Sequence, residues 1–263
     1  MSLRSLVAFA AALTALAAAL PARAGQCAAK SSARTAALVE LYTSEGCSSC
    51  PPADRWLSTL RHAGQARDDI VPLALHVDYW DYIGWKDPYA RPQFGTRQRR
   101  IAALQHTGFV YTPQVVLQGR DFRDWGSGAF ERAVAKINAQ PAKAAISLSL
   151  ERLRNGLLRV EAAARVLESR RRDSAALYLA AYQSRLVSRV GAGENRGRTL
   201  EHDFVVRDWV GPIDFGPDGQ LRQARGLSLP REAVVGNSGV AAFVQDRRTA
   251  EVLQALLLPV CPG

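Results

Sequence analysis

The first half of the chain alternates short apolar segments with segments of helical spacing. Apolar residues occupy both faces of the segments 36–43, 70–77 and 108–117, which is typical of strands covered on both sides. A further short strand is expected over 121–125, and helices are expected from residue 51, over 98–105 and over 127–138. This order predicts an α/β arrangement in which parallel strands carry an antiparallel pair at one edge.

The second half of the chain changes to a period of two. Polar and apolar residues alternate in segments separated by glycine-containing turns, namely 144–150, 157–167, 175–190, 199–215 and 221–229, followed by apolar segments over 238–246 and 251–258. Such a series predicts an antiparallel β-sandwich or barrel. We therefore expect a first domain over residues 25–141 and an all-β C-terminal domain over 142–263.

The N-terminus has the features of an export signal. An apolar run over 6–20 follows Arg4 and precedes the small–x–small sequence 22–24, which predicts a signal peptide over 1–24. The run is shorter than the ~20 residues of a spanning helix. A lipoprotein is not expected, because Gln26 stands where a small residue would precede Cys27. We expect a periplasmic or secreted protein with no membrane segment after cleavage.

The basic excess does not point to nucleic acid. The chain has 34 Lys and Arg against 24 Asp and Glu, a net charge of +10. These charges are spread thinly, and the densest run, 169–173, has no interleaved aromatic residues. A nucleic-acid interface needs basic clusters with stacking aromatics, so no nucleic-acid partner is expected.

The chain has four cysteines, and an even count in an exported protein suggests disulfides. Cys27 and Cys261 stand near the two ends of the mature chain. Because the termini of compact proteins often lie close together, we expect a structural disulfide between them. The alternative, that both thiols are free, stays open.

Cys47 and Cys50 form a C-x-x-C sequence between a buried strand and a helix. The helix N-terminus favours a thiolate there. A structural zinc site would need a second pair of ligands, and the chain has no second C-x-x-C and only scattered histidines. We therefore expect neither a metal nor a cofactor.

Three stretches carry a resemblance to known proteins. The segments 39–54, 76–81 and 112–114 make the whole chain resemble a family of exported bacterial proteins known only as a domain of unknown function, with a thioredoxin-like first domain. The order of strand, C-x-x-C, helix and a Thr-Pro before a late strand resembles the thioredoxin superfamily over about residues 36–138. With the period-two pattern of the second half, this resemblance implies an α/β fold class, with a thioredoxin-like N-terminal domain followed by an antiparallel β-sandwich-like C-terminal domain. It also implies a cis Thr112–Pro113 bond that stands beside the cysteines where substrate backbone docks.

Two departures from the superfamily pattern concern the cysteines directly. Gly46 stands where many thioredoxins have an aromatic residue, and Ser48-Ser49 replaces Gly-Pro between the cysteines. Glu45 opposes a thiolate at Cys47 electrostatically. These features predict an intermediate reduction potential for the Cys47–Cys50 pair, rather than the high potential of a strong oxidant.

Several neighbouring residues have two interpretations. Glu40 lies in a buried strand, so it is either a functional acid of the redox site, as thioredoxins carry on this strand, or the partner of an arginine. Trp80, Trp85 and Thr112 either form a substrate-binding wall with Glu45 or pack a small core. His76 is expected to be a buried strand residue. Residues 201–203 cannot form an acid–base cluster, because successive side chains of a strand point to opposite faces.

The sequence favours an exported thiol–disulfide oxidoreductase acting on a protein or small-molecule thiol or disulfide. Cys47 attacks, the more buried Cys50 resolves the mixed disulfide, and Pro113 and Glu40 assist. One alternative is a non-catalytic binding protein in which Cys47–Cys50 is a staple. Another is a soft-metal carrier for Cu(I), against which the single methionine argues. The oligomeric state stays open.

Overall fold

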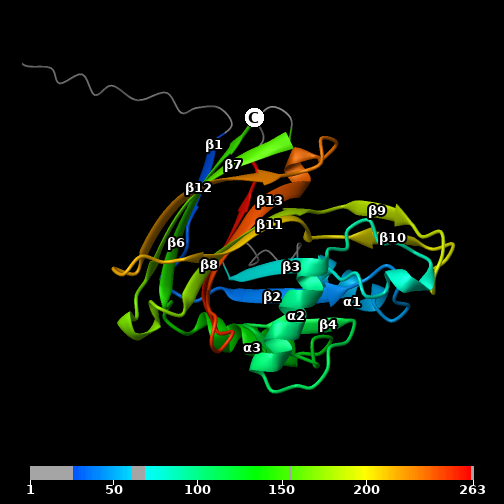
Figure 1. Ribbon diagram of the computed structural model, residues 1–263, viewed down its shortest axis with the longest axis horizontal. Coiled ribbons are helices and arrows are strands. Elements are labelled where there is room, and N and C mark those ends of the chain that lie inside the picture. Colours follow the sequence, from blue (N-terminus) through cyan, green and yellow to red (C-terminus); the bar gives the residue numbers. More distant parts are fainter. Residues whose placement is uncertain (1–25, 61–68, 154–155, 262–263) are drawn as a thin grey trace, which may run out of the picture.

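The computed structural model describes residues 26–60, 69–153 and 156–261. The predicted signal peptide, residues 1–24, lies outside these ranges. The described residues form three α-helices and fourteen β-strands in three sheets (Figure 1). None of the described helices is long and apolar enough to cross a membrane.

The largest sheet has eight strands and mixes parallel with antiparallel pairs. Its order is β14-β13-β8-β11-β3-β2-β4-β5. These strands are β14 (Val252–Pro259), β13 (Ser238–Asp246), β8 (Ala175–Gln183), β11 (Val205–Asp214), β3 (Ile70–His76), β2 (Ala37–Thr43), β4 (Gln114–Leu117) and β5 (Arg120–Asp121). Strands from both halves of the chain therefore share one sheet.

Two smaller sheets complete the β structure. One is four-stranded, with β1 (Gln26–Lys30), β6 (Ala144–Arg152), β7 (Leu157–Val166) and β12 (Gln220–Ser228) in that order. The other is a hairpin of β9 (Leu186–Arg189) and β10 (Thr199–His202). In Figure 1 the four-stranded sheet lies at the left, and the hairpin extends to the right above α1.

The predicted fold class is wrong at the junction of the two halves. The described chain is mostly β, and it shows no clear thioredoxin-like α/β pattern followed by a separate sandwich. Instead β3 pairs in parallel with β11, with Val205 opposite Ala74, and the Ala74 N–H donates to the Phe204 carbonyl at 2.9 Å. A buried strand needs hydrogen-bond partners along both edges, and here a strand from the second half supplies them. The eight-stranded sheet contains strands from both sides of residue 141, the predicted boundary between the domains. The domain limits 25–141 and 142–263 stay a prediction.

The three helices are α1 (Pro51–Thr59), α2 (Pro92–Leu104) and α3 (Ala129–Asn138). Proline stands in the first turn of α1 and of α2, where its missing N–H costs nothing. The second helix begins six residues earlier than predicted, at Pro92, and its first turn buries Phe94. The strand expected within 108–117 is β4, and the strand expected over 121–125 is only the two-residue β5, which begins one residue earlier.

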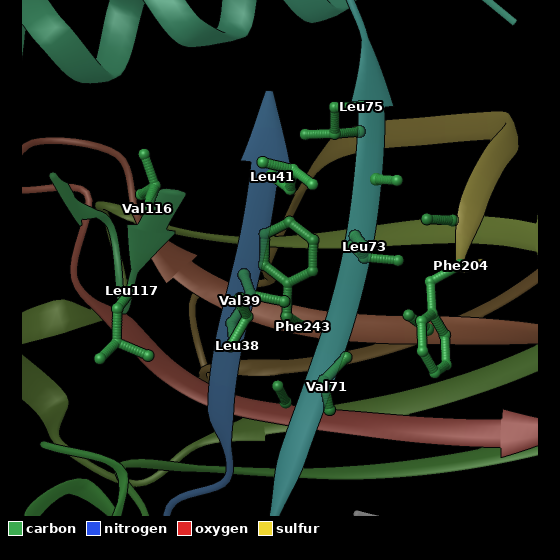
Figure 2. Close-up of a cluster of buried hydrophobic side chains, with 14 of the residues drawn as sticks. Leu38, Val39, Leu41, Val71, Leu73, Leu75, Val116, Leu117, Phe204 and Phe243 are labelled. Carbon is green, nitrogen blue, oxygen red and sulfur yellow. The ribbon is translucent and has the colours of Figure 1, made fainter. Parts of the chain in front are cut away.

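Two hydrophobic cores lie on opposite faces of β8 and β13, and the first of them also covers both faces of the central strands β2 and β3. Figure 2 shows part of the first core, in which Phe243 lies between β2 and β3 and Phe204 lies on the far side of β3. The second core fills the space between the four-stranded sheet and β8, β13 and β14. Because both faces are covered, every residue of β8 and β13 is buried, whereas the segment 175–190 that contains β8 was expected to alternate polar and apolar residues.

A disulfide joins Cys27 in β1 to Cys261, which follows β14. The two residues are separated by 234 positions, and their Cα atoms are 5.7 Å apart. Both sulfurs belong to the apolar surroundings of the second core. This bridge ties the C-terminal strand to the edge of the four-stranded sheet.

Candidate functional site

The Cys47–Cys50 disulfide lies between the end of β2 and the start of α1. Its Cα atoms are 5.5 Å apart, and Cys50 is the residue that immediately precedes the helix. The Cys50 N–H donates to the Cys47 carbonyl at 3.2 Å, which closes the loop as a turn. Both cysteines are 0% exposed, whereas Ser48 and Ser49 between them are exposed. The expectation that Cys50 is the more shielded of the two is therefore not met.

The loop of the β9–β10 hairpin covers this disulfide. The Asn195 side-chain amide donates to the carbonyls of Glu45 at 2.8 Å and of Cys47 at 2.9 Å. The Ser48 N–H donates to the Glu194 carboxylate at 2.8 Å. Asn195 is itself fully buried. The second half of the chain thus closes the site that the first half carries.

The two tryptophans of the expected wall point their indole N–H groups inward. Trp80 donates to the Thr112 hydroxyl at 2.7 Å, and Trp85 donates to the Glu45 carboxylate at 2.8 Å. The Trp85 ring also packs under the hairpin loop, where a Cβ on Gly191 would lie only 3.1 Å from the ring. Half-buried Trp85 thus lies between the cysteine loop and its cover, whereas half-buried Trp80 contacts the segment that precedes Pro113.

The Thr112–Pro113 peptide bond is cis, as the resemblance implied. Pro113 is half-buried and directly precedes β4. The first residue of β4, Gln114, pairs with Tyr42 near the end of β2. This register places the Thr112–Pro113 segment at the edge of the sheet from which the cysteine loop also leaves.

Beneath the cysteine loop lie five ionisable side chains that we call the buried histidine cluster: Glu45, Asp54, His76, Asp87 and His202. None is more than 5% exposed. His76 Nδ1 lies 2.7 Å from Asp87 Oδ2, and His202 Nε2 lies 3.2 Å from Glu45 Oε1. The two imidazole rings are 4.9 Å apart and meet edge to face. Asp87 also accepts the Glu45 N–H at 2.8 Å, so the two pairs are joined.

The pKa shifts in this cluster have competing causes. Burial acts to lower the pKa of His76, but the neighbouring Asp87 carboxylate prevails and the pKa is raised. Burial acts to raise the pKa of Asp87, and its pairing with His76 reverses this and lowers the pKa. Burial raises the pKa of Asp54, and the nearby His202 and His76 offset only part of the rise. The protonation of His76, Asp87 and Asp54 is therefore coupled, since each of these groups shifts the pKa of another.

Glu40 is not part of this cluster, because it pairs with an arginine. Its carboxylate accepts from Arg97 Nε at 2.6 Å and from Nη2 at 3.1 Å. The Arg97 guanidinium lies 5.1 Å from the ring centre of each of Tyr178, Trp209 and Phe243. Of the two interpretations left open by the sequence, the arginine pairing is the one observed.

The sequence did not identify three residues of the site, namely Asp87, Asn195 and His202 as the partner of Glu45. His76 is a buried strand residue, as expected. His202 is buried while Glu201 beside it is exposed. Successive side chains of this strand therefore point to opposite faces, as expected when a local acid–base cluster of residues 201–203 was excluded. The actual partner of His202 is 157 positions away, and no local pattern encodes such a pairing. Among the described residues no group of histidines, cysteines and acids is arranged to hold a metal ion.

The fold and the site define a mostly β protein in which a C-x-x-C disulfide lies over buried histidines. The particular family is shown by its sequence model. The chain belongs to the family described as "protein of unknown function (DUF1223)", which matches residues 38–245. No curated protein sequence matches the chain.

Solved structures share the fold. A crystal structure of a protein from Agrobacterium tumefaciens is 27% identical and has a TM-score of 0.60, with 88% of this chain and 96% of that chain covered. HBP35 of Porphyromonas gingivalis is 15% identical with a TM-score of 0.64, and covers 88% of this chain and 76% of that chain. The second likeness, at so low an identity, concerns the fold alone.

Proposed function

We propose that this protein is an exported thiol–disulfide oxidoreductase whose redox pair is Cys47–Cys50. The observation that carries the proposal is a disulfide of sequence separation 3 at a helix N-terminus above buried ionisable groups. In the chain-entropy model so short a loop contributes only about 2 kcal/mol, against about 5 kcal/mol for a loop as long as that of Cys27–Cys261. A structural role thus accounts for little of the Cys47–Cys50 bridge.

The chemistry is a thiol–disulfide exchange. A substrate thiolate attacks Cys47 Sγ, the Cys47–Cys50 bond breaks, and its electron pair goes to Cys50 Sγ, which takes up a proton. A second substrate thiolate then releases Cys47 and forms the substrate disulfide. Because α1 begins directly after Cys50, its N-terminal N–H groups favour negative charge on the leaving sulfur.

We also propose that the site, rather than the fold as a whole, is related to that of the thioredoxin superfamily. This relation rests on a strand, a C-x-x-C turn, a helix and a Thr-Pro segment that meet at one edge of a sheet. Two disulfides are consistent with an exported protein. A signal peptide over residues 1–24, and hence a periplasmic or secreted location, completes the proposal.

A second candidate is a non-catalytic binding protein in which Cys47–Cys50 is a staple. The observation that favours it is the cover formed by Asn195 and Glu194, under which both sulfurs are inaccessible. For an oxidoreductase the hairpin loop must move aside before a substrate reaches Cys47. The two candidates therefore differ in whether the bridge can be reduced in the folded protein.

A glutathione titration followed by thiol labelling and peptide mapping separates the candidates. We expect Cys47–Cys50 to be reduced between about −270 and −120 mV, in the more reducing half of that span, while Cys27–Cys261 stays oxidised to below roughly −300 mV. Cys47→Ser should abolish exchange, and Cys50→Ser should trap mixed disulfides. If both bridges resist reduction together, Cys47–Cys50 is a staple and the binding protein is the correct candidate.

A further inference from the structure

Each histidine of the buried histidine cluster uses one ring nitrogen and leaves the other free. His76 faces Asp87 through Nδ1 and His202 faces Glu45 through Nε2, so these nitrogens carry the protons that the carboxylates accept. Among the described residues His76 Nε2 and His202 Nδ1 have no hydrogen-bond partner, although both are buried. Whether it carries a lone pair or a proton, this second ring nitrogen has no partner inside the protein, which is costly unless it has a role.

The cluster flanks the disulfide on both sides along the chain. Glu45 precedes Cys47 by two residues and reaches His202. Asp54 lies one helical turn after Cys50, its N–H donates to the Cys50 carbonyl at 3.1 Å, and its carboxyl is close enough to both histidines to feel their charges. The residues on either side of the redox pair therefore converge on the same two rings.

We propose that the buried histidine cluster is the proton reservoir of the Cys47–Cys50 pair, with His76 and His202 as the groups that hold the exchanged proton. This inference rests on the proposed function and adds to it the source of the proton. The histidines are positioning residues, since they act on Cys50 through the cluster rather than by touching a substrate.

The proton and electron balance is simple. When the substrate thiolate breaks the Cys47–Cys50 bond, the electron pair on Cys50 Sγ is neutralised by a proton from an imidazolium of the cluster, which becomes neutral. In the reverse direction the cluster removes the Cys50 proton, the thiolate attacks the mixed disulfide at Cys47, and the substrate leaves as a thiolate. No oxidant beyond the substrate disulfide is needed.

Carboxyl, aromatic and guanidinium groups from the described part of the chain face the two rings. Asp87 and Glu45 face them from loops, and Asp54 faces them from α1. The Tyr89 ring lies 5.2 Å from His76 and 5.7 Å from His202, with the Arg207 guanidinium 5.0 Å from its outer face. Although burial opposes it, the Asp87 carboxylate raises the pKa of His76 and so favours protonation of that ring.

Matched variants test this directly. His76→Asn keeps a donor at the Nδ1 position and His202→Gln keeps one at the Nε2 position, so each preserves its carboxylate contact and removes the titration. With glutathione disulfide as substrate at pH 7, the reduced wild type should react at least tenfold faster than either variant, and the variants should recover near pH 9. The exposed His106→Asn should match the wild type. Unchanged pH profiles in both variants would overturn the inference.

A measurement on the wild type alone covers the case in which a variant does not fold. The ring-proton signals of His76 and His202 should titrate at different pH values in the oxidised and reduced protein, because a group that exchanges a proton with Cys50 must respond to its state. His106 should titrate identically in both. Identical titration of all three would overturn the reservoir while leaving exchange intact, whereas a bridge that glutathione never reduces would instead refute the proposed function.

Discussion

Two buried glutamates stand five positions apart in the same segment, and their partners give them opposite roles. Glu40 is held by two hydrogen bonds from Arg97, a cation that stays charged at any physiological pH. Glu45 is held by Trp85 and His202, and a histidine changes its charge near neutrality. Equal burial of both glutamates therefore does not imply equal function. The partner decides whether a buried acid belongs to a permanent ion pair or to a site whose charge changes with pH. We call the surroundings of Glu45 the responsive site in this sense.

The surroundings of the two acids follow the same division. Arg97 from α2 is enclosed by Tyr178, Trp209 and Phe243, which come from β8, β11 and β13. The Glu40–Arg97 pair therefore joins strands from both halves of the chain at the centre of the large sheet. Glu45 lies in the cysteine loop, where its contacts reach only the site and its cover.

The largest effect on the free energy of unfolding should come from breaking the Glu40–Arg97 ion pair. Arg97→Met leaves the Glu40 carboxylate buried and uncompensated, so we expect a loss of about 3–5 kcal/mol in the free energy of unfolding. The double variant Glu40→Gln/Arg97→Met removes both charges and should lose much less. Urea unfolding at pH 7 measures both. Equal destabilisation of the single and double variants would show that Arg97 acts through packing alone.

A smaller effect on stability is expected from loosening the β9–β10 hairpin loop, which covers the responsive site. Asn195→Ala removes two hydrogen bonds and leaves the Glu45 and Cys47 carbonyls without that donor, which should cost about 2 kcal/mol. The loosened loop should also raise the rate at which dithiothreitol reduces Cys47–Cys50 several-fold. Asn237→Ala, in a partly exposed turn, is the matched control. A reduction rate unchanged from the wild type would mean that the loop does not limit access.

The responsive site should also reveal itself as a pH dependence of stability. The pKa of His76 is raised, so its contribution is fully present below the unfolded value of about 6.5 and is lost as pH rises through the folded pKa. The pKa of Asp87 is lowered, so its contribution is present above about pH 4 and lost as pH falls through the folded pKa. The difference in unfolding free energy between the wild type and His76→Asn should therefore peak between about pH 4 and 6.5. The same difference for the double variant Glu40→Gln/Arg97→Met, which leaves no titrating group at this place, should stay flat from pH 5 to 9. A parallel pH course for the two differences would contradict the comparison.

The smallest effect should be a gain in stability. Burial raises the pKa of Asp54, so this carboxyl stabilises the fold while it is protonated and costs stability once pH rises through the folded pKa. Asp54→Asn should therefore stabilise the protein at pH 7 by about 1 kcal/mol, with no gain below pH 4. Thermal unfolding at both pH values measures this, with the exposed Asp173→Asn as control. A loss of stability at pH 7 would show that the ionised carboxylate has a partner it needs.

Much of the local structure could be predicted from the sequence because it depends on local causes. The apolar segments of 36–43 and 70–77 became β2 and β3, and Pro51-Pro52 began α1, because strand burial and proline geometry act over a few residues. The cysteine pair, its place before a helix and the buried His76 were visible for the same reason. The predicted α/β fold was wrong because β3 pairs with β11, where Val205 stands 131 positions after its partner Ala74, and local periodicity does not encode a pairing over such a separation.

The sequence by itself determined the cysteines, their spacing, and the strand and helix on either side of them, since these follow from chain connectivity and local backbone preferences. Only the tertiary structure decided that Glu40 has Arg97 as its partner and that Glu45 has His202. Arg97 comes from α2 and His202 from the β9–β10 hairpin, so both partners reach the glutamates through packing between elements that are distant in the sequence. Hydrogen bonds of buried carboxylates must be satisfied somewhere, but which distant residue satisfies them depends on how the whole chain packs.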